Sequence, residues 1–123
     1  MITGDFPVRS RANAERYGWG GPDGDTCDGW HLLRSAELSV IEERMPPGSA
    51  EVRHWHRRAR QFFYVVAGEL TMETDSGDRT LRTGDGLEIP PGCAHRAVNR
   101  ASVDARFLVV SQPPARDDRV YTQ

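Results

Sequence analysis

Two glycine-bounded segments that together carry three histidines constrain the fold of this 123-residue chain more than any other feature. Residues 48–68 contain His54 and His56, and residues 84–99 contain His95. Side chains two residues apart lie on the same face of a β-strand, so a strand over 52–56 would point both imidazoles the same way. With His95 on a neighbouring strand, the three imidazoles would converge inside a β-structure and form a site for a transition metal.

The rest of the chain predicts short strands separated by turns, and no segment has a helical period. Prolines and a glycine at 46–48 end one strand, and residues 75–78 are typical of a hairpin turn. A series of this kind is typical of an all-β sandwich or barrel. The predicted strands cover residues 30–34, 38–45, 51–56, 61–66, 69–74, 79–82, 86–89, 94–99 and 105–111.

Composition divides the chain into three parts. Residues 1–29 are polar and rich in glycine and aspartate, which predicts an irregular N-terminal arm. Residues 30–112 hold the predicted strands and form the barrel domain. Residues 113–123 are a polar C-terminal tail.

Charge and residue types exclude several classes of function. The net charge is -2, which gives no reason to expect nucleic acid or a membrane surface as partner. All 16 basic residues are arginine, so Schiff-base catalysis by a lysine is excluded. No secretory or membrane-spanning segment is present in the sequence, which predicts a cytoplasmic location. Cys27 and Cys93 form no disulfide framework and are interpreted as free thiols.

The spacing within the two segments resembles the two sequence motifs of the cupins, over roughly residues 30–111. Two long motifs in the right order are far more specific than one short motif. The one departure is Gln61, which stands where the family usually has glutamate. The resemblance implies a double-stranded β-helix, or jelly-roll, barrel. The first motif corresponds to Gly48, His54, His56, Gln61 and Gly68, and the second to Gly84, Pro90, Gly92, His95 and Asn99.

The resemblance further implies that His54, His56, Gln61 and His95 bind one divalent transition metal ion per chain. Histidine-rich sites accept Fe, Mn, Ni, Cu or Zn. Because an amide is neutral, the ion would keep its full charge, favour an anionic chelating substrate and have no carboxylate base beside it. Alternatively, Gln61 is an outer group, hydrogen-bonded to a water or to an imidazole.

Strand alternation and position give further candidate pocket residues. Phe63 shares the face of Gln61, Ala97 shares the face of His95 and leaves room for a ligand, and His31 would close the pocket from the side of the arm. Phe62 and Tyr64 face the opposite way, toward another sheet or subunit. The loop residues Arg57, Arg58 and Arg60 either guide an acidic ligand or form a solvated hairpin loop, and the second interpretation is favoured.

We therefore expect a protein that binds a small molecule, most simply a metal-dependent enzyme. The resemblance to cupins indicates a dioxygenase-like activity on a chelating organic substrate. A sugar isomerase or epimerase is the first alternative, for which Glu42, Glu43 or Glu51 would have to supply a base. A non-enzymatic metal- or ligand-binding protein is the second, so enzymatic activity stays open at this point. The resemblance also implies a homodimer, which would cover an exposed strand edge.

Overall fold

The structure is a computed structural model that describes residues 4–122. Over these residues it contains strands and no helix, which confirms the predicted all-β class. The predicted arm and tail include residues 1–3 and 123, which lie outside the described part. The strands are β1 (Glu15–Trp19), β2 (Cys27–Arg34), β3 (Ser39–Met45), β4 (His54–His56), β5 (Arg60–Ala67), β6 (Glu69–Thr74), β7 (Gly77–Arg82), β8 (Gly86–Ile89), β9 (His95–Val98), β10 (Ala105–Gln112) and β11 (Arg119–Tyr121).

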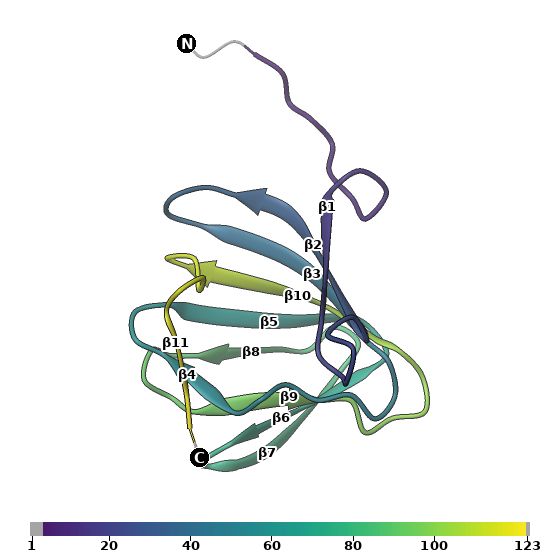
Figure 1. The fold of residues 1–123 in the computed structure, drawn as a ribbon, viewed down its shortest axis with the longest axis vertical. Helices are drawn as coiled ribbons and strands as arrows, with labels where there is room; N and C mark the ends of the chain where they lie inside the picture. The colour runs from purple at the N-terminus through teal and green to yellow at the C-terminus, as the bar shows by residue number, and fades with distance from the viewer. Residues whose placement is uncertain (1–3, 123) are drawn as a thin grey trace.

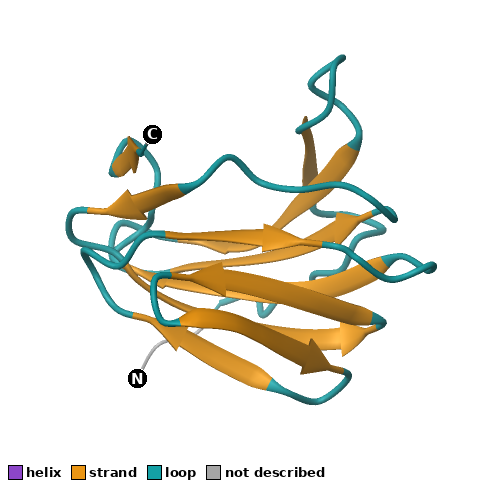
Figure 2. Cartoon of the chain, turned by 90° about the horizontal axis from the view of Figure 1, so that it is seen from below, coloured by secondary structure: helices purple, strands orange, loops and turns teal. Residues whose placement is uncertain are grey.

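The strands form two antiparallel sheets that face each other, as Figures 1 and 2 show. The larger sheet has the order β1-β2-β3-β10-β5-β8, and the smaller has the order β11-β4-β9-β6-β7. Strands far apart in the sequence are therefore neighbours, with β10 between β3 and β5, and β9 between β4 and β6. This crossing brings the two histidine-bearing segments side by side in the smaller sheet.

Alternation along β5 and β10 builds the core between the sheets. On β5, Gln61, Phe63 and Val65 are buried, whereas Phe62 and Tyr64 are 43% and 39% exposed, as the pattern predicts. The inner face of β10 packs beside them in register. The buried apolar cluster consists of Cys27, Met45, Phe63, Val65, Leu70, Met72, Leu81, Ile89, Ala97, Ala105, Phe107 and Val109.

Two short strands lie outside the predicted set. β1 falls in the predicted arm and pairs with β2, from Glu15 opposite His31 to Trp19 opposite Cys27. β11 falls in the predicted tail and pairs with all three residues of β4. Short strands of this kind are set by the partner they pair with more than by their own residues. Strand structure therefore extends into both flanking segments.

Three glycines with positive φ lie in the connections between strands. Gly48 and Gly84 have positive φ angles, at 81° and 91°. Gly68, between β5 and β6, has a φ of 80°, and a Cβ placed there would lie 2.2 Å from the carbonyl oxygen of Asp104. A Cβ at Gly84 would meet nothing within 4 Å among the described residues.

We expect Gly68→Ala to lower the free energy of unfolding by about 2 kcal/mol, because alanine adds both left-handed backbone strain and a clash with backbone. Gly84→Ala is the matched control, since it carries the strain without the clash and should cost about 1 kcal/mol. Urea unfolding of both variants measures the difference. Equal losses would contradict the close approach at Gly68.

Candidate metal centre

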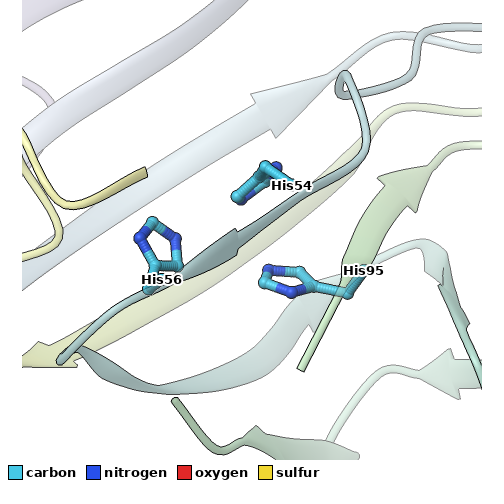
Figure 3. A group of neighbouring side chains, drawn as sticks. All are labelled: His54, His56 and His95. Atoms are coloured by element: carbon cyan, nitrogen blue, oxygen red, sulfur yellow. The ribbon is translucent and has the colours of Figure 1, made fainter. Parts of the chain in front are cut away.

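Three histidines from two neighbouring strands converge between the sheets. β4 carries His54 and His56 on its inner face, and His95 on β9 pairs with His54. One ring nitrogen from each histidine lies within 4.8 Å of the other two. All three side chains are buried, and Figure 3 shows the three rings gathered together. The predicted convergence is confirmed, and such a set of nitrogens can bind a transition metal.

Backbone carbonyl groups orient two of the rings. Nδ1 of His54 lies 2.7 Å from the carbonyl oxygen of Val52, and Nδ1 of His95 lies 2.9 Å from that of Cys93. A carbonyl oxygen only accepts hydrogen bonds, so Nδ1 is the donor in both rings and Nε2 keeps its lone pair. Both Nε2 atoms are therefore free to bind an ion, the usual arrangement for a metal-ligating histidine.

The turn before β9 ties the second histidine segment to the first. Gly92 has a φ of 83°, and its N–H donates a hydrogen bond to the carbonyl oxygen of His56 at 2.8 Å. The prolines at 90 and 91 and this glycine turn the chain so that His95 enters the sheet beside β4. This hydrogen bond therefore holds the turn before β9 against β4.

Four buried polar atoms of this interior have no hydrogen-bond partner among the described residues: both ring nitrogens of His56, Nε2 of His95 and Oε1 of Gln61. A buried polar group left unpaired costs about 1–3 kcal/mol. Gln61 is fixed from its other end, because its Nε2 donates to Ser111 Oγ at 3.1 Å across the paired strands β5 and β10. Imidazole nitrogens and an amide oxygen that lack partners fit a divalent cation.

Of the three predicted pocket residues, Phe63 and Ala97 lie near the converging histidines and His31 does not. The Phe63 ring lies with its centroid 6.0 Å from that of His95. Ala97 follows His95 by two residues on the same face and is fully buried. His31 instead lies on β2 in the larger sheet, where its ring contacts that of Tyr17 at 5.0 Å, and it is not one of the converging histidines.

The arginine loop between β4 and β5 has its contacts at the surface. Arg57 lies over the Trp55 ring at 5.6 Å, and Arg60 contacts Gln112 and Glu88. Arg58 has an exposed side chain. These contacts agree with the solvated-loop interpretation rather than with a guide for an acidic ligand.

The structure adds two residues beside the histidines that the sequence interpretation missed. β11 pairs Arg119 with His56 and Tyr121 with His54. Cross-strand partners share a face, so both side chains lie at the edge of the centre. The buried carboxylate of Asp118 fixes this strand, because it accepts hydrogen bonds from the N–H groups of Arg58 and Ala59. Alternation over three residues was too short a signal to predict this strand.

Burial keeps the two histidines of β4 neutral. It lowers the pKa of His54 to about 4, with the positive charge of Arg119 acting the same way and the hydrogen bond to Val52 opposing it. Burial also lowers the pKa of His56 to about 4, helped by the charges of His54, Arg119 and His95. Neutral imidazole is the form that binds a metal, so both rings are in the ligating form at neutral pH.

We expect a bound divalent ion to be retained down to about pH 5 and released as the pH falls toward 4, because protons displace an ion only when the imidazoles can be protonated. An ordinary histidine, with a pKa near 6.5, would begin to release it more than one unit higher. Dialysis against metal-free buffers across this range, followed by elemental analysis, measures the midpoint. Loss of half the ion above about pH 6 would contradict the lowered pKa values.

Comparison with known proteins identifies similar chains. Residues 41–111 match the sequence model described as cupin domain. The chain is 39% identical over 62 residues to Protein SchB of Streptomyces halstedii, covering 50% of this chain and 45% of SchB. It is 34% identical over 76 residues to quercetin 2,3-dioxygenase of Bacillus subtilis, covering 57% of this chain and 23% of the enzyme. The aligned part is thus less than half the length of either relative.

Among solved structures, the polyketide cyclase RemF from Streptomyces resistomycificus superposes with a TM-score of 0.78 at 19% identity, covering 97% of this chain and 88% of RemF. A likeness at this identity concerns the fold. A Klebsiella pneumoniae protein described as having a double-stranded β-helix domain also superposes, with a TM-score of 0.69 at 20% identity over 99% of both chains, which confirms the predicted barrel. In residues 4–122 there is no helix of the length and apolarity needed to cross a membrane.

Proposed function

This chain belongs to the cupin domain family, and from that premise we propose that it is a metal-dependent enzyme acting on a small organic molecule that chelates through oxygen. The proposed ligands are His54, His56, His95 and Gln61. The observation that carries the proposal is the set of buried nitrogen and oxygen atoms without partners in this interior. Such atoms are costly unless an ion or a ligand pairs with them.

The neutral ligand set supports an anionic substrate. Three imidazoles and an amide leave the charge of a divalent ion uncompensated, and an enolate or carboxylate would compensate it. When bound, the ion supplies Lewis acidity toward substrate oxygens and, if it is iron, redox chemistry with dioxygen. Ser111 orients the Gln61 amide, and the carbonyl groups of Val52 and Cys93 orient two rings. The protein thereby presents its donors in one fixed arrangement.

Phe63 and Ala97 would border the substrate. The Phe63 ring lies against His95 and supplies an apolar wall, while the methyl group of Ala97 leaves space on the same face. An apolar surround with few polar groups is typical of a small-molecule site. Arg119, opposite His56, adds a positive charge that would attract an anionic substrate.

Dioxygenation is the reaction we propose first. It is supported by the neutral ligand set and by the similarity to quercetin 2,3-dioxygenase. Ring closure of a polyketone is the second candidate, supported by the superposition on RemF over nearly the whole chain. Both reactions start from an enolisable, chelating substrate, whereas only the first consumes oxygen. Sugar isomerisation ranks below them because the neutral ligand set favours an anionic chelating substrate over a neutral sugar.

Oxygen uptake tests the proposal. Protein loaded anaerobically with Fe(II) is mixed with 1,3-diketones, flavonols and catechols, and oxygen is followed with an electrode. We expect substrate-dependent uptake with at least one of these classes, and none in protein loaded with redox-inactive Zn²⁺. Substrate conversion without uptake would favour ring closure. No conversion and no uptake with any class would contradict the proposed function.

We further propose that the protein works as a cytoplasmic homodimer. Phe62 and Tyr64 present aromatic surface on the outer face of β5, and β1 leaves one edge of the larger sheet open. Aromatic side chains and free strand edges are commonly covered by a partner subunit. Gel filtration with light scattering measures the mass, and a monomer at micromolar concentration would contradict the dimer.

A further inference from the structure

Glu43 directs a carboxyl group toward the interior that holds the histidines. It shares the inner face of β3 with the fully buried Met45, and it pairs with the buried Phe107 on β10. The Phe107 ring centroid lies 6.1 Å from that of Phe63, which lies 6.0 Å from that of His95. Inward-facing side chains thus connect Glu43 to the candidate metal centre. Glu43 is partly buried, whereas the three histidines are buried.

The three strands at this end of the larger sheet are arranged around the carboxyl group. The Tyr17 hydroxyl on β1 donates a hydrogen bond to Glu43 Oε2 at 2.8 Å. The phenol lies over Gly29 on β2, where a Cβ would come within 2.1 Å of Tyr17 Cζ. Burial raises the pKa of Tyr17 well above its usual value, so the phenol remains a donor. The sheet therefore fixes Glu43 through one oxygen and leaves the other for a second partner.

Charged groups beside Glu43 also border the histidines. Arg119 lies 3.8 Å from Glu51, measured from Nη2 to Oε2; its positive charge opposes the rise in the pKa of Glu43 and helps burial to lower those of His54 and His56. One guanidinium group therefore acts on both the carboxyl group and the ring cluster. Glu51 in turn accepts a hydrogen bond from the N–H of Ala97 at 2.9 Å, on the strand that carries His95.

The protonation of Glu43 suits proton exchange near neutral pH. Burial, and then the negative charge of Glu51, raise the pKa of Glu43 to about 8, against the opposing effects of the Tyr17 hydrogen bond and Arg119. A group transfers protons most effectively when its pKa lies near the working pH.

We propose that Glu43 is the catalytic residue that exchanges a proton with the substrate, with Tyr17 as its positioning residue. This inference rests on the proposed function and gives the substrate class as a molecule with an acidic C–H or O–H group next to its chelating oxygens. The Glu43 carboxylate takes that proton, the C–H or O–H bond breaks, and its electron pair stays on the substrate as an enolate. The product is the carboxylic acid at Glu43 and an anionic substrate, so charge and protons balance.

Counting protons on binding tests this role without turnover. Zn²⁺-loaded protein is titrated anaerobically with pentane-2,4-dione by calorimetry, about half a pH unit above the pKa of Glu43, in two buffers of different ionisation enthalpy. We expect the wild type to release only part of a proton to the buffer, because the negative charge of the bound enolate raises the pKa of Glu43, which then keeps most of the proton that the diketone loses. Glu43→Gln should release more, by up to about 0.8 proton per site, because Glu43 is about three-quarters ionised at this pH and an amide cannot accept a proton. Tyr17→Phe should fall between the two, because loss of its hydrogen bond raises the pKa of Glu43.

Glu42→Gln is the matched control. Glu42 is the neighbouring residue on β3, but it forms ion pairs with Arg11 and Arg106 instead of the contact with Tyr17. This variant should release as few protons as the wild type, and thermal melting checks that all variants fold. Equal proton release by wild type and Glu43→Gln would overturn the role of Glu43 while leaving the proposed function intact. A wild type that binds neither the diketone nor a flavonol would instead overturn the proposed function, and this inference with it.

Discussion

His95→Ala is expected to lower the affinity for a divalent ion by about a thousand-fold or more. Loss of an outer hydrogen-bond partner of a ligand already costs ten- to a hundredfold, and removal of a ligand costs more. His95 is fully buried, its Nδ1 is engaged with a backbone carbonyl, and its Nε2 has no partner in the described structure. The variant therefore removes a nitrogen already oriented for an ion, and no exposed side chain can take its place.

Competition against a chromophoric chelator measures this loss, with elemental analysis of the purified variant as a second readout. His31→Ala is the control, because His31 is a histidine that lies outside the converging set. It should retain the wild-type affinity to within about threefold. Far-UV circular dichroism and a melting curve show whether His95→Ala keeps its fold. A folded His95→Ala protein with unchanged affinity would show that the ion binds elsewhere.

The sequence predicted those features that depend on residues close together in the chain, namely which way strand side chains face and where turns fall. The side-chain period of a strand placed His54 and His56 on one face, and the same rule placed Phe63 inward and Phe62 outward. Turn chemistry predicted the end of a strand at residues 46–48, and β3 ends at Met45. These features follow from short stretches, and the structure confirms each of them.

Features that depend on distant pairing were not predictable in this way. β11 is three residues long, and its position beside β4 depends partly on Asp118 accepting hydrogen bonds from the loop that follows β4. The contact of Tyr17 with Glu43 requires β1 to pair with β2 so that the phenol covers Gly29. Glu43 was considered as one of three candidate carboxylates. Alternation places it on the opposite face of the strand from Glu42, but which face is the inner one depends on how β3 pairs with β10. A single sequence does not specify such registers.

Gln61→Glu is expected to raise the affinity for a divalent ion by about a hundredfold at neutral pH, if the side chain is a ligand as proposed. A carboxylate adds a negative charge where the amide offers only a dipole. Ser111 Oγ can donate to a carboxylate as readily as it accepts from the amide, so the side chain keeps its anchor. Because a buried carboxyl group must lose its proton to bind the ion, the affinity of the variant should rise more steeply with pH than that of the wild type.

The same substitution should weaken the binding of an anionic chelator to the loaded protein, since the ion then carries less uncompensated charge. Gln61→Ala is the companion variant: it removes the oxygen, leaves Ser111 in place, and should lower the affinity for the ion. Titrations of all three proteins with Zn²⁺ and then with pentane-2,4-dione measure both effects. Opposite changes in affinity for the ion and for the diketone would indicate direct ligation by residue 61. A change below about tenfold in both variants would instead assign Gln61 to an outer position, where it acts only through its hydrogen bonds.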